Sequence, residues 1–133
     1  TLDRSSAASD VYKRQPQRKA FLQTFWKFYK SRDVWLLLSA FDKEPEAILE
    51  QLDWLGSFFA DALKARLDIA TGWINPDLQN GIIPFSQALS PQKLLKGYQL
   101  IQQTSQDLRR INAVSQELML ADCLTKLVLD VLE

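Results

Sequence analysis

The chain has 133 residues, of which 47% are hydrophobic and 24% charged, and its 16 basic residues balance 16 acidic ones. This length fits one domain with a core, and the hydrophobic fraction excludes a disordered chain. It has no histidine and a single cysteine, which excludes His-dependent nucleophile sites, His-containing zinc sites and internal disulfides. None of its 4 glycines lies in a phosphate-binding motif, so we expect no catalytic residue, no cofactor-binding residue and no metal ligand.

Residues 1–15 differ from the rest of the chain, because they show no apolar periodicity and contain a cluster of serine and alanine. This segment resembles translated adapter or read-through sequence, and a native flexible linker is the alternative. Both interpretations predict disorder and no function. We therefore expect a non-native or disordered leader at 1–15 and one folded domain at 16–133.

The next two segments predict helices. Pro16 suits a first helical turn, and we expect a helix from Gln17 to Ser31. Asp33 can cap a short helix from Val34 to Phe41, which is apolar nearly all round and should be buried. The apolar side chains of the first helix share one broad face, and three lysines and a glutamine lie opposite: Phe21, Leu22, Phe25, Trp26, Phe28 and Tyr29 against Lys19, Gln23, Lys27 and Lys30.

Pro45 opens a third helix that is expected to run to about Leu67. Trp54 and Phe58 lie outside its main apolar seam, so this helix is either central in the fold or in contact with a partner. The apolar seam consists of Ile48, Leu52, Leu55, Phe59 and Leu63. The opposite polar stripe, which should be solvated, consists of Glu46, Glu50, Asp53, Ser57, Asp61 and Lys64.

Residues 68–89 form a long connection, in which we expect one short helix near Pro84 to Leu89. The pair Ser90-Pro91 predicts the start of a helix that ends near Asn112. Ser115 can cap a last helix, whose only polar stripe is Asp122, Lys126 and Asp130. A stripe this narrow indicates that something covers the last helix on more than one side. Together these segments predict an all-α fold, a single antiparallel helical bundle of five to six helices.

The charge distribution suggests one candidate site. Residues 1–32 carry eight basic and two acidic side chains, and the remainder carries eight against fourteen. A basic end is typical of contact with nucleic acid or an anionic membrane. No apolar run approaches the ~20 residues of a membrane-spanning helix, and the N-terminus lacks the apolar stretch of a secretory signal, so we expect a cytoplasmic protein without a membrane partner. The nucleic-acid candidates are Arg18, Lys19, Lys27 and Lys30.

The remaining candidates are apolar. Cys123 lies among leucines and is expected to act as a small buried hydrophobe. An aromatic pocket around Trp26, Trp35 and Trp54 is a further alternative, which would bind a small apolar molecule. The Trp54/Phe58 patch and the last helix could be core or could contact a partner, and the partner-contact candidates are Trp54, Phe58, Leu118, Met119 and Leu127.

Several short motifs resemble the delta-prime subunit family of bacterial DNA polymerase III. The first is Gln51-Leu52-Asp53-Trp54-Leu55, followed by Ala60-Asp61-Ala62-Leu63-Lys64. The second is Leu89-Ser90-Pro91-Gln92-Lys93-Leu94. The third is residues 114–124, which resemble the family's Ile-Asn-x-Glu-Leu-Leu-(apolar)-x-Asp-Leu-Leu run, with Ser115 where the family often has Asn. Both residues are good helix N-caps.

The resemblance covers about residues 16–133 and implies the C-terminal collar domain of that subunit. It implies a non-catalytic chain whose partners are the other clamp-loader subunits, arranged as a pentameric ring that loads the sliding clamp on primed DNA. The holoenzyme to which such a chain belongs is a DNA-directed DNA polymerase. The resemblance implies no cofactor, no small-molecule substrate and at most indirect contact with DNA.

Overall fold

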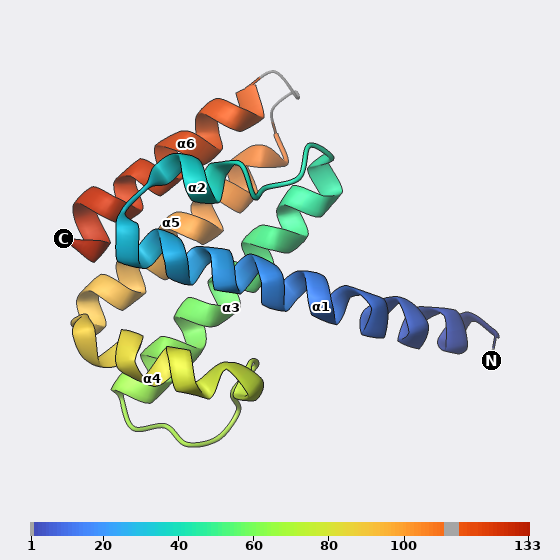
Figure 1. Cartoon of the computed structure of the whole chain (residues 1–133), viewed down its shortest axis with the longest axis horizontal. Coiled ribbons are helices and arrows are strands. Elements are labelled where there is room, and N and C mark those ends of the chain that lie inside the picture. Colours follow the sequence, from blue (N-terminus) through green and yellow to red (C-terminus); the bar gives the residue numbers. More distant parts are fainter. Residues whose placement is uncertain (1, 111–114) are drawn as a thin grey trace.

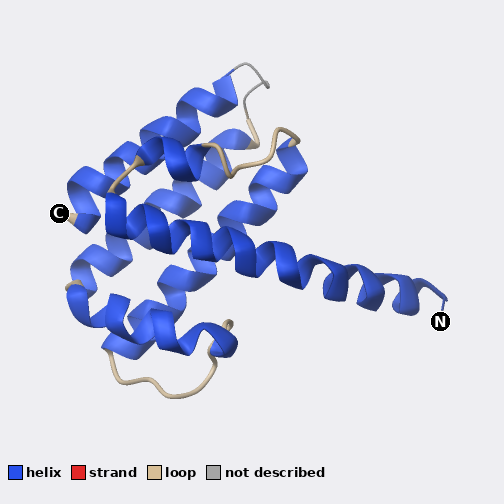
Figure 2. Cartoon of the chain, in the orientation of Figure 1, coloured by secondary structure: helices blue, strands red, loops and turns tan. Residues whose placement is uncertain are grey.

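The structure is a computed structural model that describes residues 2–110 and 115–133, with side chains from Arg14 onward. These residues form helices joined by loops, with no strand among them (Figure 2), which confirms the predicted all-α class. The elements are α1 Leu2–Ser31, α2 Val34–Leu38, α3 Pro45–Arg66, the 3-10 turn η1 Pro76–Leu78, α4 Gln79–Ala88, α5 Pro91–Leu108, α6 Gln116–Lys126 and the π-helical turns η3 Leu127–Leu132.

The long helices α3 and α5 form the most extensive helix pair of the bundle. Helix α1 crosses the front of this pair, with α4 on one side of it and α2 and α6 on the other (Figure 1). The N-terminal half of α1 projects beyond the other helices. Two surfaces follow from this arrangement: one along α6 and η3, and one between α1 and α4.

Helix α1 begins at Leu2 and not at Gln17, so the predicted start of the first helix was wrong. That residues 1–15 are a non-native or disordered leader stays a prediction. The segment 2–15 contains no glycine or proline, so nothing in it blocks extension of a helix that the packed part of α1 has already nucleated. Pro16 inside the helix lacks the N–H that would bond one turn back, which removes a single bond. The domain boundary at residue 16 stays a prediction.

The turn after α2 differs from the prediction. Helix α2 ends at Leu38 instead of Phe41, because the side chain of Gln51 holds the following turn. Gln51 Nε2 donates to the Ala40 carbonyl at 3.1 Å, and its Oε1 accepts from the Asp42 N–H at 2.8 Å. The expectation that this helix is buried nearly all round was wrong for Trp35, which is 70% exposed.

The connection 68–89 contains more helix than predicted, namely η1 and the whole of α4. Helix α5 begins at the predicted Ser90-Pro91, where the Ser90 hydroxyl accepts from the Lys93 N–H at 3.2 Å. Its predicted end near Asn112 lies outside the described residues. Ser115 occupies the N-cap position of α6, as predicted, but its side chain makes no capping hydrogen bond.

The core is built around phenylalanine rings. Phe25 of α1 lies 5.8 Å from Phe59 of α3 and 5.9 Å from Phe85 of α4, measured between ring centroids. All three side chains are fully buried, and edge-to-face packing of this kind contributes beyond area burial. The predicted apolar face of the first helix is therefore confirmed as core. The predicted seam of the third helix is confirmed as well, with all of its members buried except Leu63, which is half-buried.

Candidate functional site

The exposed side of α6 and η3 combines apolar and acidic side chains. Leu118 is 73% exposed and Leu129 is 59% exposed, and both lie on this side. We call the surface formed by Glu117, Leu118, Asp122, Leu129 and Asp130 the acidic face. Two of its carboxylates are already paired. Lys126 lies 2.9 Å from Asp122, which raises the pKa of the Lys126 ammonium, and Lys96 of α5 lies 4.0 Å from Asp130. The acidic face therefore offers two uncovered leucines among carboxylates.

The five predicted partner-contact residues fall into different environments. Phe58 is 3% exposed and Leu127 is fully buried, so both belong to the core. Trp54 is half-buried against Phe21, with ring centroids 6.1 Å apart. Met119 is half-buried and Leu118 is exposed. Partner contact thus stays a prediction for Trp54, Leu118 and Met119, and Leu129, which the sequence analysis did not select, joins them.

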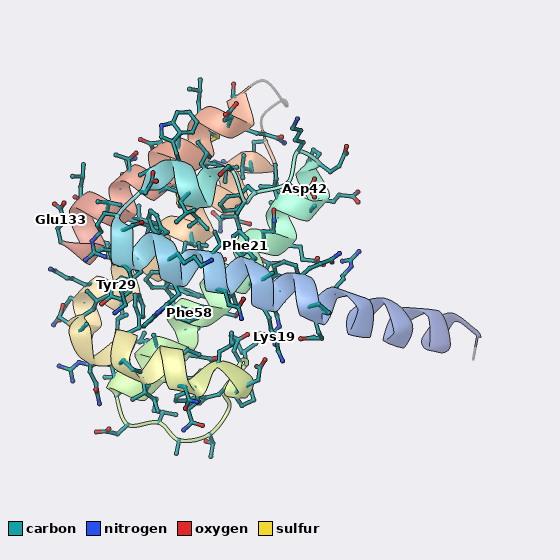
Figure 3. All side chains as sticks on the ribbon, in the orientation of Figure 1. Lys19, Phe21, Tyr29, Asp42, Phe58 and Glu133 are labelled. Carbon is teal, nitrogen blue, oxygen red and sulfur yellow. The ribbon has the colours of Figure 1, made fainter. Side chains whose placement is uncertain are left out.

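A second surface lies between α1 and α4. We call it the α1–α4 groove: an apolar depression of about 390 Å³ lined by Leu22, Gln23, Trp26, Lys27, Phe58, Asp77, Leu78, Asn80 and Gly81. Figure 3 shows Phe58 beneath α1, and Lys19 on the α4 side of that helix. Such a volume falls in the range of small ligand or side-chain pockets.

The predicted basic residues lie along α1, but they are not equivalent. Arg18 donates to Asn75 Oδ1 and to Asp77 Oδ2, both at 2.6 Å, and so joins α1 to η1. Lys19, Lys27 and Lys30 are exposed. Most of the aromatic rings of α1 point into the core and do not alternate with the lysines. The arrangement therefore lacks the stacking surface of a single-strand nucleic-acid site.

Asp61 was expected in a solvated polar stripe, and this was wrong, because its carboxylate is fully buried. It accepts from the Ile74 N–H at 2.8 Å, from the Asn75 N–H at 2.6 Å and from Asn75 Nδ2 at 3.0 Å. Asn75 Oδ1 in turn accepts a hydrogen bond from the guanidinium of Arg18 in α1. Asp61 thus fixes the connection 68–78 to α3. The sequence pattern gave no sign of this burial, because Asp61 falls in register with the other acidic residues of the stripe.

The other candidates carry no site. Burial raises the pKa of the Cys123 thiol to about 11, so it is the inert small hydrophobe that was predicted. Of the three tryptophans, Trp26 lines the α1–α4 groove and Trp54 lines a separate depression beside Arg18, whereas Trp35 is exposed on α2. They form no common pocket, so the structure does not support the small-ligand alternative.

The described residues form no metal site and no membrane-spanning helix. They contain no group of three or more acidic or cysteine side chains placed to hold a metal ion. Within the same residues, no helix is long and apolar enough to cross a membrane.

A family model described as DNA polymerase III, delta subunit, C terminal matches residues 13–128. The chain belongs to this family. It is also 43% identical over 117 residues to DNA polymerase III subunit delta' of Haemophilus influenzae, a match that covers 88% of this chain and 35% of the relative. The chain thus spans about a third of that relative's length. Both findings confirm the resemblance that the sequence motifs carry.

Proposed function

We propose that this chain is a non-catalytic assembly domain of the bacterial replicative clamp loader. It binds neighbouring subunits in the collar ring, and the ring holds the complex that loads the sliding clamp on primed DNA. The observation that supports the proposal is the family match together with the two exposed leucines, Leu118 and Leu129, of the acidic face. In this proposal, contact of the domain with DNA is at most indirect.

The energetics of the acidic face favour a protein partner. Leu118 and Leu129 leave most of their surface in water, and fully covering a leucine stabilises a complex by about 1.5–3 kcal/mol. Protein interfaces commonly place such side chains at the centre and polar groups at the rim. Glu117, Asp122 and Asp130 supply that rim here. The half-buried Met119 of the same helix extends this predicted contact surface, and Trp54, in a separate depression beside Arg18, is a second predicted contact.

A binding titration tests the proposal. The labelled chain is titrated with the clamp-loader subunits of Haemophilus influenzae, and binding is followed by fluorescence anisotropy. We expect saturable binding that the double substitution Leu118→Ser and Leu129→Ser weakens by about 100-fold, because each exposed leucine at an interface accounts for roughly tenfold. The matched control is Leu67→Ser, which removes a 53% exposed leucine at the end of α3.

Two results would contradict the proposal. The first is no binding by the parent chain to any of the subunits. The second is steeply salt-dependent binding of the isolated chain to DNA at physiological salt, which would favour the nucleic-acid alternative on Arg18, Lys19, Lys27 and Lys30.

A further inference from the structure

Arg32, the residue that follows α1, has a backbone conformation that is unusual for its type. Its φ is 61°, in the left-handed region, which a residue with a Cβ adopts only at a cost in free energy. Helices commonly end on a residue in this conformation, and that residue is usually glycine. The Arg32 N–H donates to the Phe28 carbonyl at 2.7 Å and so closes the last turn of α1. The turn itself gives no reason for an arginine at this position.

The guanidinium of Arg32 supplies that reason. Its Nη2 donates to the Leu132 carbonyl at 2.8 Å, and its Nη1 donates to the Tyr29 carbonyl. The guanidinium also lies 5.0 Å from the centroid of the Tyr29 ring, in a cation–π contact. Arg32 therefore bonds the end of α1 to the end of η3, which lie side by side although they are 100 residues apart in the sequence (Figure 1).

The end of η3 needs donors of this kind. The last carbonyls of a helix have no N–H partner within the helix. Arg32 serves the Leu132 carbonyl, and Lys93 of α5 serves the next one, because its Nζ donates to the Glu133 carbonyl at 2.7 Å. The helix dipole also favours cations at this end. Two cations from separate parts of the fold thus hold the end of η3.

The winding of η3 differs from that of the helix it continues. It is π-helical, and the Glu133 N–H that follows it donates five residues back, to the Val128 carbonyl at 3.1 Å. Such turns are rare and occur mostly at functional sites. The outer side of η3 carries Leu129 and Asp130 of the acidic face. Its inner side is buried against the core and consists of Leu127, Val128, Val131 and Leu132.

We propose that Arg32 is a latch that holds η3 closed against the end of α1, and that η3 opens as a unit when this latch is released. Opening exposes the inner side of η3 to water. It also moves Leu129 and Asp130 away from Leu118, which divides the acidic face. The strained backbone of Arg32 persists because the bond to Leu132 holds it in place. This inference concerns the chain alone and does not depend on the proposed assembly function.

Amide hydrogen exchange, followed by NMR on the full chain, measures local opening residue by residue. Arg32→Gly removes the guanidinium but suits the left-handed backbone, so its effects on the latch and on overall stability have opposite signs. We expect amides of residues 128–132 to exchange at least about tenfold faster than in the parent, because a hydrogen bond from a charged donor is lost. The buried amides of α3 should exchange no faster than in the parent.

The matched control is Arg66→Ala, which removes another arginine that bonds a carbonyl: Arg66 Nε donates to the Leu89 carbonyl at 3.3 Å. This variant should leave exchange at residues 128–132 unchanged. Exchange at the parent's rate in Arg32→Gly overturns the latch. An equal increase in η3 and α3 also overturns it, because Arg32 then stabilises the whole fold and not one segment. A similar increase at residues 128–132 in Arg66→Ala overturns it as well, because the opening is then not specific to Arg32.

Discussion

Helix α5 approaches α3 closely at Gly97. A Cβ built on Gly97 would lie 2.4 Å from Cε1 and 2.9 Å from Cδ1 of Phe59. The Phe59 ring cannot easily move aside, because it is fully buried and packs on Phe25 and Phe85 at 5.8 and 5.4 Å between centroids. Gly97→Ala therefore forces the helices apart or drives the ring out of its position.

The expected magnitude combines two opposing effects. Alanine in a helix interior is more stable than glycine by about 1 kcal/mol, whereas overpacking a filled core costs about 1–3 kcal/mol. A clash this close belongs at the upper end of that range, so the free energy of unfolding should fall by about 2 kcal/mol. The same substitution at Gly81 meets no neighbouring atom and should raise it by up to about 1 kcal/mol.

Urea denaturation followed by circular dichroism measures both variants against the parent. We expect Gly97→Ala to lower the transition midpoint and Gly81→Ala to raise it, with unchanged slopes. Because both variants replace glycine by alanine in a helix, stability changes of opposite sign separate the packing effect from the helix-propensity effect. A Gly97→Ala variant as stable as the parent would refute the tight α3–α5 crossing.

Three further outcomes follow from the buried polar groups. Asp61→Ala leaves the Ile74 and Asn75 amide donors without their acceptor and should lower the free energy of unfolding by about 3 kcal/mol. Hydrogen exchange should become faster at these two amides. Unchanged exchange there would contradict the assignment of Asp61 as their acceptor. Burial raises the pKa of the Cys123 thiol from 9.0 to about 11, so less of the thiol is thiolate at pH 8 in the native chain. Native Cys123 should therefore react with iodoacetamide at least about 100-fold more slowly than Cys123 of the unfolded chain. Comparable rates would show that Cys123 is not buried. Because the unfolded thiol ionises first, stability should fall as the pH rises from about 9 to about 11, and Cys123→Ala should flatten this slope in urea denaturation; an equal slope in that variant would exclude the thiol as its cause.

The helices that carry strong local signals were predictable. Pro45 and the Ser90-Pro91 pair mark the starts of α3 and α5 correctly, because proline at a first turn and a capping hydroxyl act within a few residues. The aromatic face of α1 was predictable from its periodicity. These signals are local, so one sequence is enough to detect them.

Features that depend on tertiary contacts were not predictable. The end of α2 is set by Gln51 from another helix, and the burial of Asp61 is set by the connection that folds over it. Apolar periodicity also selected Phe58, Leu127 and Leu118 alike as partner-contact candidates, although Phe58 and Leu127 lie in the core and Leu118 is exposed. Sequence pattern identifies an apolar helix face but does not show how much of it the chain's own helices cover.

The measurement that tests the central claim most directly is light-scattering chromatography of the chain, alone and mixed with the clamp-loader subunits of Haemophilus influenzae. The account predicts that the 15.3 kDa chain elutes in a complex of defined mass with at least one of them. It also predicts that Leu118→Ser with Leu129→Ser releases the chain from that complex. A chain that elutes as a free monomer in every mixture would contradict the assembly role.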